Sequence, residues 1–196
     1  MKKIMTLALI ILVSLTSCAL AKSPVKIARF PIIIQNNKVD KETAAMLEVK
    51  MARAVTVPMN NTLKTFEYVP PRESARILEK IWNENYVKNK DLKITEAIKI
   101  FANDTKSDLV VCPLLRYYSQ RVSPVHFSFE THLSSTVQAE LIIYDRNTDE
   151  LIYKKASRRF NDNYNRFGTA SYLAGECFNQ LITDTNIRQI IRSKKG

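Results

Sequence analysis

The stretch of sequence that decides the fold covers residues 125–160 and reads VHFSFETHLSSTVQAELIIYDRNTDELIYKKASRRF. Apolar and polar residues alternate over residues 125–132, which is typical of a β-strand with one face in water. The strand pattern continues over residues 133–144, the segment 145–149 has the composition of a turn, and residues 151–160 predict a second strand. We therefore expect an antiparallel hairpin here.

Three further strands are predicted upstream of the hairpin. Residues 25–35 and 66–69 are short runs rich in β-branched and aromatic residues, and residues 108–115 form an apolar run suited to a buried strand. Pro113 favours an edge or a bulge in the last of these, because proline has no N–H to donate to a neighbouring strand.

Helices are predicted where apolar residues recur at spacings of three and four. One begins after Asp40, a residue suited to cap a helix, and a second begins at Pro71 and places Trp82 in its buried stripe. A third covers residues 94–102, and the last follows Gly168. The predicted order is β-α-β-α-α-β-β-β-α. It favours a single α/β (α+β) domain with a central mixed β-sheet covered by helices.

The amino-terminal segment has the order of a secretory signal. Lys2 and Lys3 precede an apolar run at residues 4–15, and small residues follow up to Ala21. The run is shorter than the roughly 20 residues that cross a bilayer as a helix, so we expect no transmembrane span in the mature chain. We expect residues 1–21 to be a cleavable signal peptide that directs export.

Two cleavage sites fit this signal. The small-x-small pattern at residues 19–21 predicts cleavage before Lys22, whereas residues 15–18 read LTSC and resemble the lipobox at which bacterial lipoproteins are cut and acylated, here on Cys18. The sequence leaves both open, but the folded pattern starts by Val25 and leaves little tether after Cys18, which favours the soluble form. In the first case residues 22–196 form one exported domain with a short basic tail at Lys194 and Lys195.

The composition is basic and poor in glycine. Lys and Arg number 30 against 19 Asp and Glu, a formal net charge of +11, and residues 1–21 hold only two of these bases. Export makes another envelope protein, an anionic envelope polymer or lipid head groups the expected partner, and not nucleic acid. The glycines are Gly168, Gly175 and Gly196 alone, which excludes glycine-rich phosphate loops and the G-x-S-x-G elbow. No cofactor is predicted.

A cluster of basic residues follows the hairpin turn. It comprises Lys154, Lys155, Arg158 and Arg159, and its spacing places positive charge on both faces of a strand. Such side chains bind phosphate or an anionic polymer. They also prevent an exposed strand edge from pairing with other chains, so the sequence allows either interpretation.

A candidate metal site lies in the alternating stretch. His126, Glu130 and His132 share one strand face, and imidazole with carboxylate suits zinc. With a bound water this set predicts metal-assisted hydrolysis, which is the alternative function. The other interpretation is a polar strand face in water.

Two cysteines remain after cleavage before Lys22. Cys112 lies in an apolar run and Cys177 in a predicted helix. An oxidising compartment permits a disulfide between them, whereas the other interpretation is that each is a small buried hydrophobic residue.

Tyrosines gather in the second half of the chain and favour a recognition surface, because tyrosine combines a large contact area with a polar tip. They are Tyr117, Tyr118, Tyr144, Tyr153, Tyr164 and Tyr172. The other interpretation is that half of them flank the core.

Three segments carry a resemblance to known exported α/β domains. Residues 26–32 (KIARFPI), 66–73 (FEYVPPRE) and 107–111 (SDLVV) resemble strands of the amino-terminal domain of the Tol system's propeller protein (TolB) and of the curli-secretion lipoprotein (CsgG-like). The resemblance spans residues 25–182. It implies a non-catalytic module for envelope assembly or partner binding, with no catalytic residues to carry over.

Overall fold

The computed structural model describes residues 23–35, 39–58, 60, 65–87, 92–124 and 130–194. Its elements are, in chain order, β1 (Val25–Arg29), β2 (Ile33–Ile34), α2 (Lys41–Val55), β3 (Phe66–Val69), α4 (Pro71–Val87), α5 (Ile94–Thr105), β4 (Leu109–Pro124), β5 (Thr131–Asp145), β6 (Glu150–Asn163), the 3₁₀ turn η2 (Arg166–Gly168), α6 (Ala170–Asp184) and α7 (Ile187–Ser193). Apart from the division of the first strand and the additional turn η2 and short helix α7, this order follows the predicted β-α-β-α-α-β-β-β-α.

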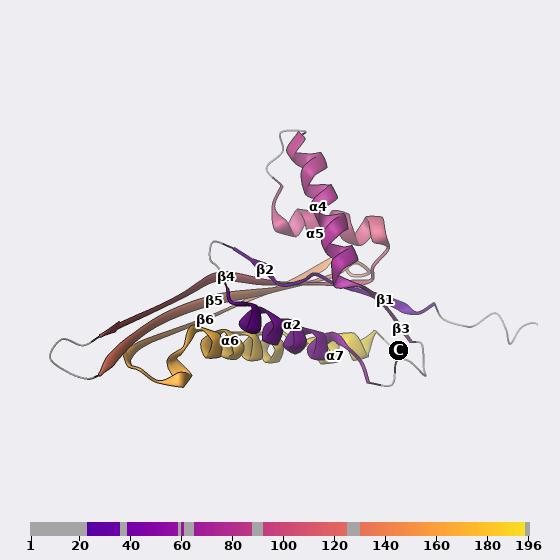
Figure 1. Ribbon diagram of the computed structural model, residues 1–196. Helices are drawn as coiled ribbons and strands as arrows, with labels where there is room; N and C mark the ends of the chain where they lie inside the picture. Colours follow the sequence, from indigo (N-terminus) through magenta and orange to yellow (C-terminus); the bar gives the residue numbers. More distant parts are fainter. Residues whose placement is uncertain are drawn as a thin grey trace, which may run out of the picture.

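All six strands belong to one mixed sheet. The strand order is β3-β1-β4-β5-β6, and β2 pairs with β4 beyond the end of β1. β1 is parallel to β3 and β4, whereas β4, β5 and β6 form an antiparallel meander. Figure 1 shows α4 and α5 on one face of the sheet, called the upper face here, and α2, α6 and α7 on the other, the lower face. The predicted α/β fold with a helix-covered mixed sheet is confirmed.

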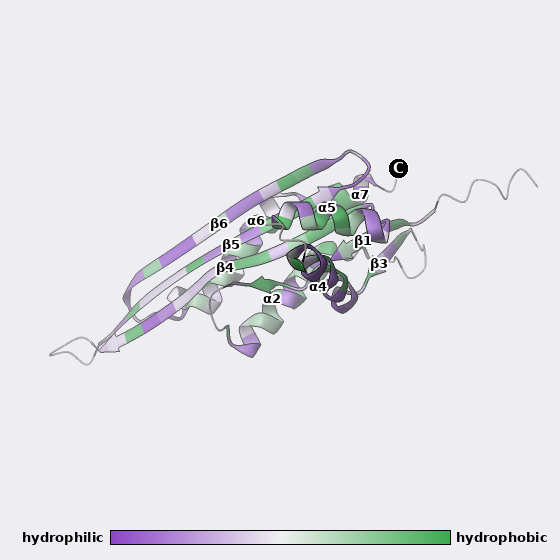
Figure 2. Ribbon diagram, turned by 90° about the horizontal axis from the view of Figure 1, so that it is seen from above, coloured by the Kyte–Doolittle hydropathy of each residue, from purple (hydrophilic) through white to green (hydrophobic). Residues whose placement is uncertain are grey.

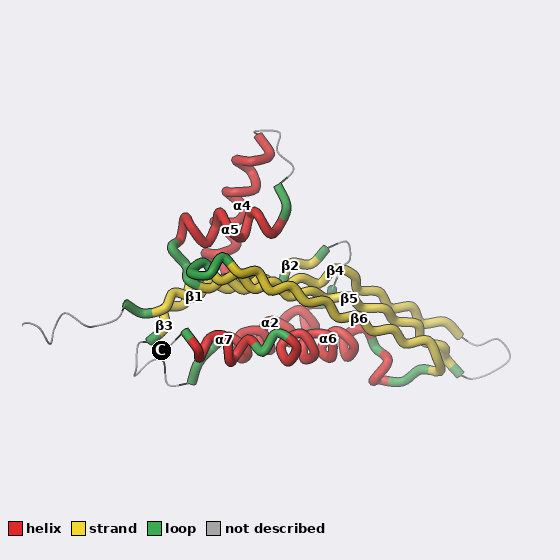
Figure 3. Tube along the Cα trace, turned by 180° about the vertical axis from the view of Figure 1, so that it is seen from behind, coloured by secondary structure: helices red, strands yellow, loops and turns green. Residues whose placement is uncertain are grey.

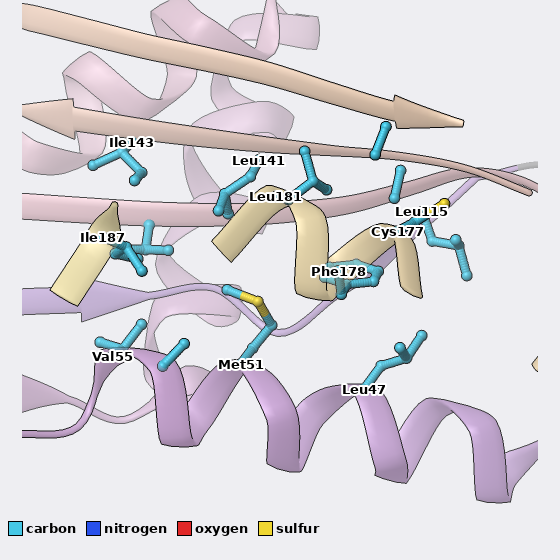
Figure 4. Close-up of a cluster of buried hydrophobic side chains, with 14 of the residues drawn as sticks. Leu47, Met51, Val55, Leu115, Leu141, Ile143, Cys177, Phe178, Leu181 and Ile187 are labelled. Carbon is cyan, nitrogen blue, oxygen red and sulfur yellow. The ribbon is translucent and has the colours of Figure 1, made fainter. Parts of the chain in front are cut away.

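The lower face carries the larger core. Leu47 and Met51 of α2, Leu141 of β5 and Phe178 and Leu181 of α6 are fully buried against one another (Figure 4). Burying a side chain of this size contributes about 1.5–3 kcal/mol relative to leaving it in water. Through this core, α2 from the first half of the chain and α6 from the second half both pack against the centre of the sheet.

Polar caps fix where the lower helices begin. The Asp40 side chain accepts a hydrogen bond from the backbone N–H of Thr43 at 2.7 Å, as predicted for this cap. The Thr169 side chain caps α6 in the same way. The hydroxyl of Thr43 also contacts that of Ser171 at 2.7 Å, which joins the first turns of α2 and α6.

A second core lies on the upper face beneath α4 and α5. Phe30 and Phe101 meet edge to face with ring centroids 4.7 Å apart, and Leu78 and Ile81 of α4 are buried with them. Figures 1 and 3 show α4 rising steeply away from the sheet towards its C-terminal end. Trp82 is therefore 39% exposed. The prediction that it belongs to the core is wrong, because the helix leaves the sheet within a turn of Leu78.

The predicted first strand, residues 25–35, is interrupted between β1 and β2. The backbone N–H of Ile32 donates to Glu48 Oε1 of α2 at 2.6 Å. The same carboxylate forms an ion pair with Arg29 at 2.7 Å. Pro31 has no N–H and the N–H of Ile32 is bound to Glu48, so β1 does not continue and a strand re-forms only at Ile33.

Pro113 lies in β4 opposite this interruption. The carbonyl oxygen of Val111 accepts from the N–H of Phe30 at 2.9 Å, and that of Leu115 accepts from the N–H of Gln35 at 3.0 Å. Because alternate residues of a strand face the same neighbour, Pro113 faces the gap between β1 and β2. β4 is thus an interior strand, and its proline occupies a place where the neighbouring strand is broken.

The antiparallel meander extends beyond the helices as a three-stranded ribbon. Its register shifts between Leu115 and Tyr117 and then continues to the pair Pro124 and Thr131. β4 is therefore longer than the predicted run 108–115. Of the alternating stretch 125–132, residues 125–129 lie outside the described residues. Among the helices that the structure describes, none is long and apolar enough to cross a bilayer.

Candidate ligand-binding surface

The upper face of the ribbon is not covered by the helices that cover the rest of that face. Seen from the side of α4, hydrophilic residues predominate along β6 and along the outer parts of β4 and β5 (Figure 2). We call this surface the open face. The alternation of the strands assigns to it Tyr117, Ser119 and Arg121 of β4, Ser134, Thr136, Gln138 and Glu140 of β5, and Tyr153, Lys155, Ser157 and Arg159 of β6.

The pleat of β6 divides the predicted basic cluster between two faces. Ala156 packs in the lower core, so Lys154 and Arg158, which share its parity, lie on the lower face. Lys155 and Arg159 lie on the open face. The four residues that the sequence groups together are therefore two pairs on opposite sides of an edge strand.

Glu140 forms an ionic cluster at the inner end of the open face. Glu140 is 7% exposed, and its carboxylate lies 2.6 Å from Arg116 Nε and 3.5 Å from Lys155 Nζ. The Lys155 ammonium also lies 5.0 Å from the centroid of the Tyr153 ring. Burial raises the pKa of Glu140, but hydrogen bonds from Tyr153 and Arg116 and the charges of Arg116 and Lys155 outweigh it and hold the pKa below its usual value. Glu140 is therefore ionised, and its negative charge is paired with the positive charges of Arg116 and Lys155.

The open face has an excess of positive charge. Arg116, Lys155, Arg121 and Arg159 surround it, and along its described strands Glu140 is the carboxylate that faces them. Arg121 and Arg159 lie on either side of β5, opposite Ser134 and Thr136. Hydroxyl and amide side chains fill the space between the cations, so the face offers hydrogen-bond donors as well as charge.

The predicted metal ligands are only partly described. His132 Nε2 lies 3.1 Å from Asn161 Oδ1, and Glu130 accepts a hydrogen bond from Asn163 Nδ2 at 3.1 Å. His126 lies outside the described residues. Within the part of the chain that the structure describes, no three His, Cys, Asp or Glu side chains gather as a metal site. The metal site and the hydrolase built on it stay predictions.

The two cysteines lie on opposite faces of the sheet. Cys112 of β4 belongs to the upper core and Cys177 of α6 to the lower core, and both are fully buried and free. Burial raises the pKa of Cys112 to about 12 and that of Cys177 to about 11. The sheet between them prevents the disulfide that their even number permits, because the pair cannot reach the short Cα separation of a bridge.

The tyrosines occupy several environments. Tyr117 and Tyr153 are exposed on the open face, whereas Tyr144 is buried under α5. Tyr118 packs against the lower core, and its hydroxyl lies 3.2 Å from Asp40 Oδ2. Tyr164 and Tyr172 are exposed where the ribbon meets α6. Two of the six therefore contribute to the open face.

A groove that the sequence analysis did not predict lies between α4 and the sheet. It has a volume of about 440 Å³. Its lining consists of Phe30, Pro31, Ile33, Gln35, Ala75, Leu78, Glu79, Trp82, Asn83, Ile94 and Leu114. We call it the α4 groove. The signal that could have indicated it is the large aromatic residue at the end of the apolar stripe of α4.

No protein-family model and no curated protein sequence matches this chain. Among solved structures, it is similar to the hypothetical protein CT253 of Chlamydia trachomatis, with 9% identity over 83% of this chain and 95% of the other and a TM-score of 0.47. Lipoprotein GNA1162 of Neisseria meningitidis is 14% identical over 82% and 99% of the two chains, with a TM-score of 0.39. The PelC dodecamer of Paraburkholderia phytofirmans is 12% identical over 82% and 86%, with a TM-score of 0.42. These likenesses concern the general fold alone, and the predicted resemblance to TolB and CsgG stays a prediction.

Proposed function

We propose that this protein is an exported, non-catalytic module of the cell envelope that holds an anionic envelope polymer on its open face. The observation that carries the proposal is the uncovered sheet surface on which Arg116, Arg121, Lys155 and Arg159 outnumber Glu140, the one carboxylate on this face within the described parts of β4, β5 and β6, and Glu140 is buried and paired. An excess of fixed cations over a flat surface attracts a flexible polyanion and retains it by many weak contacts.

The spacing of the donors supports a polymer as the ligand. Arg121 and Arg159 are exposed and lie on the two outer strands of the ribbon, with Ser134 and Thr136 of β5 between them. Guanidinium groups bind carboxylates and phosphates through two parallel hydrogen bonds. A chain lying across the three strands would therefore meet a cation on each side and hydroxyl groups in the middle.

The amino-terminal signal supports the location. Lys2 and Lys3, the apolar run and the small residues up to Ala21 direct a chain to the export machinery. Whether the chain is then cut before Lys22 or acylated on Cys18 decides between a diffusible and a membrane-anchored form. In both forms the ligand of the open face is a component of the envelope.

A pair of matched variants tests the open face. Arg121→Ala with Arg159→Ala removes two charges from the open face, whereas Lys154→Ala with Arg158→Ala removes two from the lower face of the same ribbon. Lys155 stays in place because it pairs with Glu140. We expect the first double variant to weaken binding of polygalacturonate by about 5-fold to 10-fold, and the second by less than about 2-fold.

The measurement is isothermal titration at low and at physiological ionic strength, with neutral dextran as the control polymer. Affinity for polygalacturonate should fall as salt is added, because exposed charges are screened within about 10 Å at 0.1 M. Equal losses in the two double variants, or equal binding of dextran, would contradict the proposal.

A further inference from the structure

Most of the residues that line the α4 groove are apolar. Phe30 and Leu114 are fully buried beneath it, and Trp82, the only tryptophan of the chain, forms part of the wall on the side of α4. Its polar lining residues are Gln35, Glu79 and Asn83. An exposed tryptophan beside an apolar channel loses contact with water when a hydrocarbon ligand enters, and this favours binding.

One end of the groove adjoins the positive charge of the open face. Gln35 lines the groove, and its side-chain oxygen accepts a hydrogen bond from Arg116 Nη1 at 2.5 Å. Arg116 in turn contacts Glu140, which also pairs with Lys155. Two cations thus share one carboxylate at this end, and the local charge is positive.

We propose that the α4 groove holds the hydrocarbon chain of an anionic amphiphile, such as a fatty acid or a lipid-linked anionic glycan, whose head group lies against Arg116 and Lys155. This inference deepens the proposed function, because the head group would lie at the inner end of the open face. It assigns to the ligand an acyl chain that the polymer-binding surface alone does not require.

The chemistry of the lining favours a hydrocarbon chain over a peptide. A peptide brings an N–H and a C=O group with every residue, and such groups lose free energy in an apolar site unless they find partners. The backbone groups of α4 are used within the helix, so on that wall a peptide would find only the side chains of Glu79 and Asn83 as polar partners. An acyl chain has no such requirement.

The size of the groove agrees with one small ligand. Its volume of about 440 Å³ lies within the range of roughly 300–1,000 Å³ in which proteins bind small molecules. The groove also has the composition of such sites, in which apolar walls hold the ligand and a few polar groups orient it.

Trp82 reports directly on occupancy of the groove. The probe is 9,10-dibromostearate, added below its critical micelle concentration, because bromine quenches indole fluorescence only at close contact. We expect saturable quenching of Trp82 in the folded protein, and displacement of the probe by unbrominated stearate should restore the fluorescence. Dibromostearyl alcohol, which has the same chain and no charge, should bind at least about 5-fold more weakly.

Two variants test where the hydrocarbon chain and the head group of the ligand bind. Ala75→Phe fills the groove and should abolish the quenching, with circular dichroism as the test that the variant is folded. Arg116→Gln should remove the preference for the acid over the alcohol. If Ala75→Phe does not fold, the test rests on the unaltered protein, in which unbrominated stearate should compete with the brominated probe for the groove.

The outcomes separate this inference from the proposed function. Quenching that does not saturate, or that persists in folded Ala75→Phe, would overturn it. A shift of Trp82 fluorescence with apolar peptides and none with stearate would also overturn it and make a protein segment the occupant. The Arg121→Ala and Arg159→Ala double variant should bind stearate normally while losing polygalacturonate, so that either proposal fails independently of the other.

Discussion

At the scale of single residues, Glu140 is the most constrained charged side chain. It is the one acidic or basic residue buried among the described residues, and it is held by Arg116 at 2.6 Å and by Lys155 at 3.5 Å. A carboxylate in the middle strand of a ribbon loses most of its hydration, so it is stable as an ion only with these partners. The sequence places Glu140 in a strand of mixed pattern and does not indicate this pairing, because the bulge after Leu115 brings Arg116 to it.

Replacement of Glu140 by glutamine tests this cluster. We expect the free energy of unfolding near pH 7 to fall by about 1–2 kcal/mol, because Arg116 loses a charged partner while the shape of the side chain is kept. The folded-state pKa of Glu140 is lowered. Its contribution is therefore present above the unfolded-state pKa and is lost as pH falls through the folded-state value. The difference between the two proteins should shrink towards pH 3.

The measurement is urea unfolding at both pH values. Glu150→Gln serves as the control, since Glu150 is exposed at the start of β6 and its replacement should change stability by less than about 0.5 kcal/mol. A difference between Glu140→Gln and the unaltered protein that stays constant from pH 7 to pH 3 would show that the pairing is not electrostatic.

At the scale of elements, periodicity predicts strands and helices well and their ends poorly. The hairpin pattern of residues 133–160 corresponds to β5 and β6, because two strand-like runs on either side of a short turn pair with each other. The run 25–35 has strand composition throughout, yet it divides because Glu48 of α2 takes the N–H of Ile32. Such a competition involves a residue distant in sequence and is not visible in the local pattern.

The burial of Cys112 and Cys177 on opposite faces of the sheet predicts their chemistry. In the folded protein, Cys112 and Cys177 should not react with Ellman's reagent at pH 8, because both thiols are buried and their pKa values are raised to about 12 and about 11. After unfolding in guanidinium chloride, both should react in a chain that begins at Lys22. Absence of reactive thiols in the unfolded chain would reveal a bridge and contradict the separation of the two cysteine side chains by the sheet.

At the scale of the whole molecule, the sheet divides two cores and two surfaces. α2, α6 and α7 cover the lower face, α4 and α5 cover the inner part of the upper face, and the outer part forms the open face (Figures 1 and 3). β1 begins at the end of the sheet opposite to the tip of the ribbon (Figure 1). A tether at the amino terminus would therefore leave the ribbon pointing away from its point of attachment.

The prediction at this scale concerns the residue at which the mature chain begins. Intact mass of the protein recovered from its own cell envelope should correspond to a chain that begins at Lys22, cut after the small residues that precede it. A mass that corresponds to diacylated Cys18 would make the protein a membrane-anchored lipoprotein. A chain that still begins at Met1 would contradict export and with it the proposed location.

The sequence by itself determined the layered α/β architecture, the meander of β5 and β6 and the helix that Asp40 caps, because these depend on local periodicity and capping. Only the tertiary structure decided which pair of basic side chains lies on the open face, since the alternation of β6 becomes a direction only when Ala156 packs against α6. It also decided that Trp82 borders a groove. The tilt of α4 away from the sheet is set by packing against α5, and no repeat in the sequence of one helix encodes the angle between two.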